Sequence, residues 1–160
     1  MADDPLASAP QRTSDPAYDI DFCAWATAQA KLLRAGRLAE ADIAHIAEEI
    51  EDLAKRDRRE LASRIRTVIE HQMKLAASPA TEPHAGWKAT INRERVEIGR
   101  LLEDSPSLRA ALPDIIAREV RTARRLVAQD MSLRGEAPMV RLDALVCSVD
   151  QVLGDVVLSR

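Results

Sequence analysis

Apolar residues recur every three or four positions along most of the chain, and this spacing is typical of amphipathic α-helices. The longest such pattern runs from Asp42 to Ser78 and predicts one long helix. At about 100° per residue, one face of this helix is apolar and predicts a core stripe. The stripe consists of Ile43, Ile46, Ala47, Ile50, Leu53, Ala54, Leu61, Ile65, Val68 and Leu75. We expect the rest of the chain to pack against this helix.

A shorter pattern before the long helix predicts a helix over residues 19–35. Gly36 follows it and favours the left-handed conformation that commonly ends helices. Gln29 interrupts the apolar face of this helix, and we expect a buried amide that is hydrogen-bonded to a neighbouring helix. Asp42 is expected to cap the long helix through its side-chain oxygen.

Two further patterns follow the loop around Pro79 and Pro83. The first predicts a helix over residues 87–103, and the second predicts a fourth helix with an apolar stripe from Leu112 to Met131. Near the end of the chain, Ser148 followed by Gln151 resembles a capping box that opens a short helix ending at Gly154.

These elements predict an all-α fold: an irregular bundle of about four main helices organised around the long one, plus a short C-terminal helix. Residues 1–17 contain three prolines and little to bury, so we predict a disordered leader there. The remaining residues, 18–160, are enough for a single helical domain with its own core.

The net charge of −3 gives no overall basic field, so we expect no nucleic-acid partner. The arginines of the fourth helix, with Glu119 and Asp130 between them, are interpreted as its solvated outer side. No apolar run approaches the ~20 residues that a membrane span needs, and no membrane association is expected. Cys23 and Cys147 lack the spacing of a CxxC motif and predict two reduced thiols in the core of a cytoplasmic protein.

A line of polar residues runs beside the apolar stripe in the second half of the long helix. Its members are Asp57, Glu60, Arg64, Thr67, His71 and Lys74, which we call the polar seam. Neighbouring helices are expected to cover this seam, and buried charges need partners. Arg64, His71 and Lys74 form a candidate anion site, with His84 or Arg95 arriving from other helices. The alternative is that the seam neutralises itself, and we expect Arg95 to reach a carboxylate.

An acidic cluster near the start of the long helix is a candidate for divalent-metal binding. Its members are His45, Glu48, Glu49 and Asp52, which share adjacent turns and offer oxygen and nitrogen ligands. The cluster points away from the apolar stripe, and no ExxH partner occurs on another helix. We therefore interpret it as a solvated face and predict neither a metal site nor a cofactor.

Several sequence segments together resemble the bacterial domain-of-unknown-function family 29. The segments are YDIDFCAWATAQAKLLRAGRL (18–38), AEEIEDLAKRDRRELASRIR (47–66), HQMK (71–74), GWKATI (86–91), LLEDSPSLR (101–109) and the tail CSVDQVLGDVVL. The resemblance implies an all-helical fold and supplies no established activity. Fold alone does not indicate function.

The expected role is a non-catalytic cytoplasmic interaction or scaffold protein. Its partner is another protein or a second copy that covers part of the long helix. The alternative is an anion-binding protein or small hydrolase that uses Arg64, His71, Lys74 and Arg95. A third possibility is a metal site on the acidic cluster.

Overall fold

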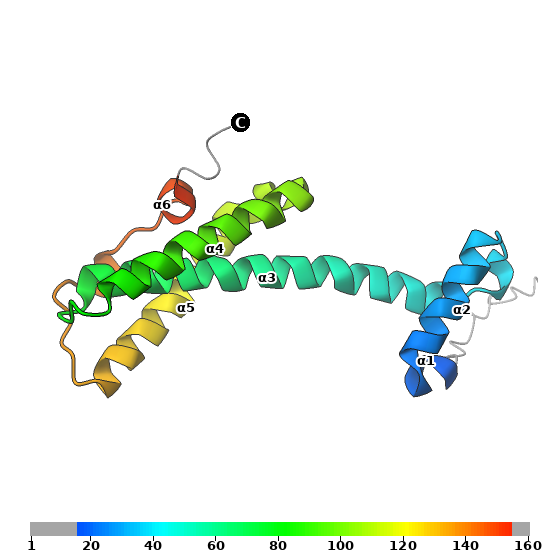
Figure 1. Cartoon of the computed structure of the whole chain (residues 1–160), viewed down its shortest axis with the longest axis horizontal. Coiled ribbons are helices and arrows are strands. Elements are labelled where there is room, and N and C mark those ends of the chain that lie inside the picture. The colour runs from blue at the N-terminus through cyan, green and yellow to red at the C-terminus, as the bar shows by residue number, and fades with distance from the viewer. Residues whose placement is uncertain (1–15, 155–160) are drawn as a thin grey trace, which may run out of the picture. The chain divides into compact units, whose positions relative to one another are not determined.

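The computed structural model of the chain describes residues 16–154 (Figure 1). Every regular element in this range is a helix, so the predicted all-α fold class is confirmed. The α-helices are α1 (Pro16–Ile20), α2 (Phe22–Arg34), α3 (Ile43–Ala77), α4 (His84–Asp104), α5 (Leu112–Leu133) and α6 (Val149–Leu153). Short 3-10 helices η1 (Leu38–Glu40), η2 (Pro106–Ala111) and η3 (Leu142–Ala144) lie in the connections. The leader predicted for residues 1–17 lies outside the described residues, except for its last two, which begin α1.

The chain divides into two compact units, Met1–Asp52 and Leu53–Arg160, which we call unit 1 and unit 2. Their described parts are residues 16–52 and 53–154. The single helical domain predicted for residues 18–160 stays a prediction beside this division. The physical basis of the division lies in the middle of α3, where every residue from 50 to 56 is exposed. A continuous core requires buried side chains, and this stretch supplies none.

Unit 1 contains α1, α2, η1 and the start of α3. Asp21 begins α2, because its carboxylate accepts the hydrogen bond of the Ala24 amide at 2.9 Å, and this cap divides the predicted helix 19–35 in two. Gly36 follows α2 with φ of 69°, as predicted. The Asp42 carboxylate accepts the amide hydrogen of His45 at 3.3 Å, which confirms the predicted cap.

Gln29 joins α2 to the start of α3. Its buried side-chain oxygen accepts a hydrogen bond from the Asp42 backbone amide at 2.9 Å, just before α3 begins. This contact confirms the prediction of a buried amide paired across helices. A buried amide without such a partner would destabilise the fold.

The apolar stripe of α3 is buried only in its second half. Leu61, Ile65 and Val68 are all 0% exposed. Three residues of the first half are instead largely exposed: Ile43 (50%), Ile50 (61%) and Leu53 (52%). The prediction that the whole stripe forms a core is therefore wrong for its first half, because periodicity identifies the apolar face of a helix and not what covers it.

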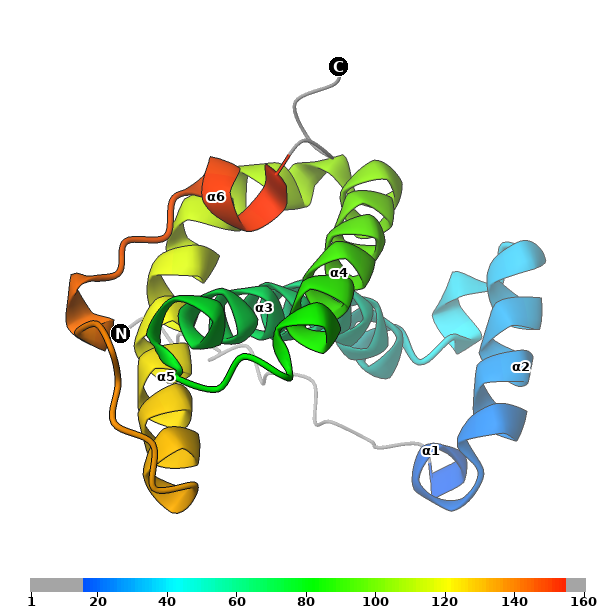
Figure 2. The same cartoon turned by 60° about the vertical axis from the view of Figure 1, so that its left-hand side comes forward.

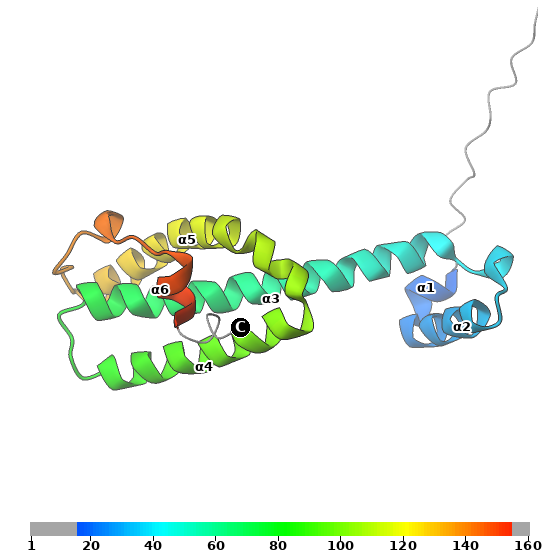
Figure 3. The same ribbon diagram turned by 90° about the horizontal axis from the view of Figure 1, so that it is seen from above.

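In unit 2, α4 and α5 lie on two sides of the second half of α3 (Figures 2 and 3). The core between them is built from aliphatic side chains of all three helices, closed by Val152 and Leu153 of α6. Ile98 of α4 and Val127 of α5 are fully buried in it. The prediction that other helices pack around the long helix is therefore confirmed for the second half of α3. The same packing determines which helix each residue of the polar seam faces.

The C-terminal helix α6 contacts both α4 and α5. Its capping box is present as predicted: the Ser148 hydroxyl accepts from the Gln151 amide at 3.2 Å, and the Gln151 side chain accepts from the Ser148 amide at 2.9 Å. Gly154 ends the helix with φ of 60°, a left-handed conformation that favours glycine.

The two cysteines are free thiols, but their burial differs from the prediction. Cys23 is exposed on α2, so its assignment to the core is wrong. Cys147 is half-buried against the core of unit 2, and this burial raises the pKa of its thiol. None of the helices within residues 16–154 combines the length and apolar character required to cross a bilayer.

Candidate functional site

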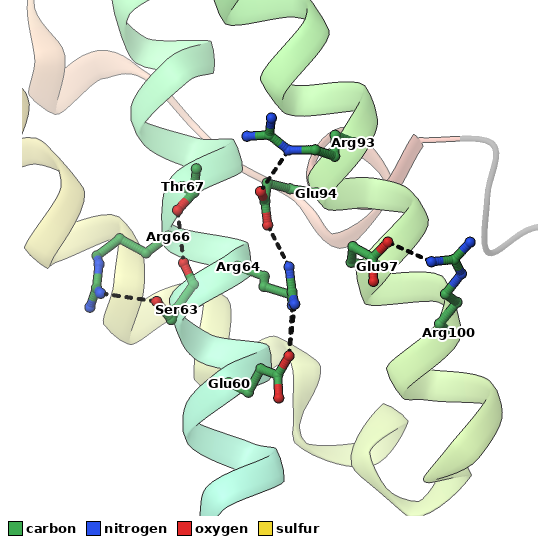
Figure 4. Close-up of polar contacts among 9 residues, drawn as sticks. All are labelled: Glu60, Ser63, Arg64, Arg66, Thr67, Arg93, Glu94, Glu97 and Arg100. Carbon is green, nitrogen blue, oxygen red and sulfur yellow. Dashed lines mark hydrogen bonds and ion pairs between the residues drawn. The ribbon is translucent and has the colours of Figure 1, made fainter.

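Arg64 lies between two carboxylates at the centre of the polar seam (Figure 4). Its Nη2 donates to Glu60 at 2.8 Å, and its Nη1 donates to Glu94 of α4 at 3.0 Å. Arg93 extends the chain of charges, with its Nε 3.4 Å from the other oxygen of Glu94. Arg64 is therefore neutralised by carboxylates of unit 2, which is the arrangement that self-neutralisation of the seam predicts.

Lys74, at the other end of the seam, pairs with a different helix. Its Nζ lies 2.7 Å from a carboxylate oxygen of Asp130 on α5. The hydrogen bond from Lys74 lowers the pKa of Asp130, and Arg134 approaches the second oxygen at 3.2 Å. Arg64 thus faces α4 while Lys74 faces α5, so the two cations do not converge on one anion.

His71 and His84 each hold one ring nitrogen that is buried without a hydrogen-bond partner in the described structure: Nδ1 of His71 and Nε2 of His84. Burial, together with the positive charge of Lys74, lowers the pKa of His71. His84 is the first residue of α4, and its ring packs 5.5 Å from that of Trp87. The His71 ring therefore favours the neutral state, and the His84 ring packs against an aromatic neighbour.

Arg95 reaches backbone oxygens of α6 and not the carboxylate expected from its place in an apolar stripe. Its Nε donates to the Val152 carbonyl at 3.0 Å, and its Nη2 donates to the Gln151 carbonyl at 2.7 Å. Gln72 of α3 also donates to the Gln151 carbonyl, at 2.6 Å. These carbonyls lie near the end of a short helix, where they lack partners within the helix, and a cation satisfies them well. Arg95 and Gln72 therefore hold α6 in place.

Three of the five residues of the predicted anion site, Arg64, Lys74 and Arg95, donate to different oxygen acceptors of the protein itself. Arg95 lines a pocket of ≈ 310 Å³ between α3 and α4, and none of the other four residues lines it. The remaining lining residues are Gln72, Leu75, Lys88, Ile91 and Asn92. The pocket is lined by the cations Lys88 and Arg95 and by apolar side chains. Arg95 of the predicted anion site therefore borders an open volume.

Glu119 on α5 is a buried, ion-paired charge that sequence reasoning missed. It is only 5% exposed, and its two oxygens accept from Arg66 of α3 at 3.3 Å and from Arg118 at 3.0 Å. The interpretation of Glu119 as part of a solvated face is therefore wrong. Its position three residues after Ile116 and four before Ala123 places it on the apolar stripe, and this spacing was the available signal.

The acidic cluster of α3 is engaged in contacts within unit 1. His45 Nδ1 lies 2.5 Å from a carboxylate oxygen of Asp42, and Glu49 accepts a hydrogen bond from the Tyr18 hydroxyl. Among residues 16–154, no three or more His, Cys, Asp or Glu side chains are grouped in a way that would hold a metal ion. The structure therefore adds no ligand to the His45, Glu48, Glu49 and Asp52 candidate.

Tyr18 and His45 form the centre of an aromatic cluster that joins α1 and α2 to α3. The two rings stack at 4.2 Å, and Trp25 meets both of them edge-on, at 4.8 Å from Tyr18 and 6.3 Å from His45. The hydrogen bond to Glu49 raises the pKa of Tyr18 to about 12. Aromatic rings commonly anchor a small core, whereas the sequence pattern placed His45 only in the acidic cluster.

His45 and His71 are expected to titrate on opposite sides of the ordinary histidine pKa of about 6.5. The hydrogen bond with Asp42 raises the pKa of His45, so its stabilising contribution is complete below 6.5 and is lost as pH rises through the raised value. Burial lowers the pKa of His71, so its contribution is complete above 6.5 and is lost as pH falls through the lowered value. Ring NMR signals followed against pH, assigned with His45→Gln and His71→Gln, test this. Coincident titration curves would contradict both environments.

Unit 1 exposes a set of large apolar side chains on its helices. The set comprises Phe22 and Leu33 on α2 and Ile43 and Ile50 on α3, which we call the unit 1 apolar face. Each of them is at least 40% exposed. Single exposed apolar residues are ordinary, but several on one small unit commonly mark an interaction surface.

Comparison with known proteins places the chain in a family. A family model described as domain of unknown function DUF29 matches residues 17–154, which is nearly the whole sequence. No curated protein and no solved structure matches the chain. The matched range includes the segments from Tyr18 to Arg109 that carry the resemblance. The chain therefore belongs to the DUF29 family of domains of unknown function.

Proposed function

We propose that the protein is a non-catalytic interaction protein of the bacterial cytoplasm and that unit 1 binds a protein partner. The observation that carries this proposal is the small core of unit 1. Among residues 17–52, only Trp25 and Gln29 are buried. Unit 2 has a full aliphatic core by comparison.

Energetics support a partner for unit 1. Ordering each residue costs about 1–2 kcal/mol of backbone entropy, and burial of one large apolar side chain returns only about 1.5–3 kcal/mol. Local helix contacts and the Tyr18 cluster offset part of this cost, but Trp25 is the only large apolar side chain that is buried among residues 17–52. Covering the unit 1 apolar face with another helix adds the missing burial.

The anion-binding alternative has weaker support. Arg64, Lys74 and Arg95 each donate to an oxygen of the protein itself, so an anion would have to compete with these partners. The pocket beside Arg95 adds only Lys88 as a second cation. An interaction role requires no such displacement.

A neutral apolar dye, Nile red, tests the proposed surface. The dilute chain is expected to enhance Nile red emission, and the double variant Ile43→Lys/Ile50→Lys is expected to lose more than about half of this enhancement. Both side chains are exposed, so the melting temperature of the double variant stays within about 2 °C of the parent. The matched control is Leu133→Lys, a more exposed apolar residue of unit 2, which should leave the dye signal unchanged.

Two outcomes would overturn the proposal. One is a parent chain that does not enhance the dye emission. The other is a melting temperature that rises several degrees with inorganic phosphate and no longer does so in Lys88→Ala, because ligand binding to the native state stabilises it by mass action. That second result would assign the function to the pocket beside Arg95.

A further inference from the structure

The unit 1 apolar face lies to one side of the contact between α2 and α3. On α3, the contact with α1 and α2 is made by Asp42 at its N-cap, by His45 and by Glu49. At about 100° per residue, Ile43 and Ile50 lie about 115° further round the helix. They are therefore turned away from the contact and open to a third helix.

The exposed residues of α2 lie on this same side. Trp25 and Gln29 point towards α3, and Phe22 and Leu33 lie about 50° further round α2. The two helices run antiparallel, since Gln29 meets Asp42 while Trp25, earlier in the chain, meets His45, later in the chain. Because the two helices run in opposite directions, their residues turn in opposite senses when both are viewed from the same end. A forward turn along each chain therefore brings Phe22 and Leu33 of α2 and Ile43 and Ile50 of α3 to the same side of the helix pair. The two helices therefore present one continuous apolar face.

The charge of unit 1 indicates which kind of partner suits the unit 1 apolar face. Residues 16–52 contain eight Asp or Glu and three Lys or Arg, a net charge of −5 with neutral histidine. Four of the carboxylates lie within residues 48–52 of α3. A second copy of unit 1 would bring −5 against −5, and like charges at an interface disfavour association. A basic helix with an apolar stripe suits both the apolar face and the negative charge of unit 1.

We propose that the unit 1 apolar face, formed by α2 and the start of α3, binds a basic amphipathic helix of another protein. The partner's apolar stripe covers Phe22, Leu33, Ile43 and Ile50. Its lysines or arginines complement the net negative charge of unit 1, and this attraction steers the approach. This inference rests on the proposed function and names the chemistry of its partner.

Calorimetric titration of the full chain with three synthetic peptides of about 18 residues tests the inference. The first is an amphipathic Leu/Lys helix, the second has the same composition in scrambled order, and the third is an amphipathic Leu/Glu helix. The first peptide is expected to bind at least about tenfold more tightly than the scrambled one, and the third is expected not to bind. The variant Ile43→Ser/Ile50→Ser should weaken binding of the first peptide at least about tenfold, while Leu133→Ser leaves it unchanged.

Three results would overturn the inference. Equal binding of the first and scrambled peptides would show charge attraction that does not depend on a helical apolar stripe. Binding that Ile43→Ser/Ile50→Ser leaves intact would place the peptide elsewhere. A dimer of the parent chain in sedimentation, lost in the same double variant, would show that a second copy occupies the unit 1 apolar face. If the peptide fails to bind while Nile red still reports the exposed face, the partner chemistry is wrong and the proposed function stands.

Discussion

Replacing Gly154 by alanine is expected to lower the free energy of unfolding of unit 2 by about 2–4 kcal/mol. The backbone at this position, with φ of 60° and ψ of −157°, is a conformation essentially restricted to glycine and costs another residue about 1–3 kcal/mol. The new Cβ would also lie 2.9 Å from Cζ of Arg95, so the guanidinium has to move. This movement weakens the hydrogen bonds from Arg95 to the carbonyls of Gln151 and Val152. A hydrogen bond from a charged group contributes about 1.5–3 kcal/mol. Urea unfolding measured by circular dichroism gives the value.

Gly86→Ala is the matched control for this substitution. Gly86 lies in α4, and a Cβ added there would have no neighbouring atom within 4 Å, so the same chemical change meets open space. Alanine in a helix is favoured over glycine by about 0.8–1.0 kcal/mol, and we expect unchanged or slightly raised stability. The double variant Arg95→Ala/Gly154→Ala should cost less than the two single changes added together, because the clash disappears with the guanidinium. Additive costs, or equal behaviour of the two glycine variants, would contradict the role of Arg95.

The features that sequence predicts well are local ones. The capping box of Ser148 and Gln151, the glycine after α2 and the cap at Asp42 each depend on residues within a few positions of one another. Such contacts form whenever the helix forms, so the residue types alone identify them. The same holds for the existence of α3, which a long apolar period predicts.

Burial along α3 could not be predicted in this way. Ile50 and Ile65 belong to the same stripe, yet Ile50 is 61% exposed and Ile65 is 0% exposed. The difference arises because α4 and α5 cover only the second half of the helix, and the period of a sequence does not report where neighbouring helices end. For the same reason the division at residue 52 leaves no mark in the pattern.

The candidate site shows a similar limit. The polar seam is sandwiched as predicted around Arg64, but its partners come from residues far along the chain, such as Glu94 and Asp130. Arg95 takes backbone carbonyls, which every residue carries and no sequence pattern distinguishes. Glu119 lies among several arginines, and their number led to the interpretation of a solvated face. Its spacing nevertheless matches the buried apolar stripe of α5.

A large difference in hydrogen exchange is expected between the two halves of α3. Residues 43–52 and 61–73 share one helix and one hydrogen-bonding pattern, so packing is the main difference between them. Amides open with free energies that range from near zero in poorly packed segments to the global value in a core. Because each 1.4 kcal/mol changes exchange tenfold, a difference of about 3 kcal/mol in opening makes residues 43–52 exchange at least about 100-fold faster.

Hydrogen exchange of the dilute chain, followed by mass spectrometry of peptides covering residues 43–52 and 61–73, tests most directly whether unit 1 needs a partner to complete its packing. We predict fast exchange in the first peptide, slow exchange in the second, and slowing of the first alone when the amphipathic Leu/Lys peptide is added. Equal protection of both peptides in the dilute chain would show that unit 1 is complete by itself, and it would contradict a role in binding another protein.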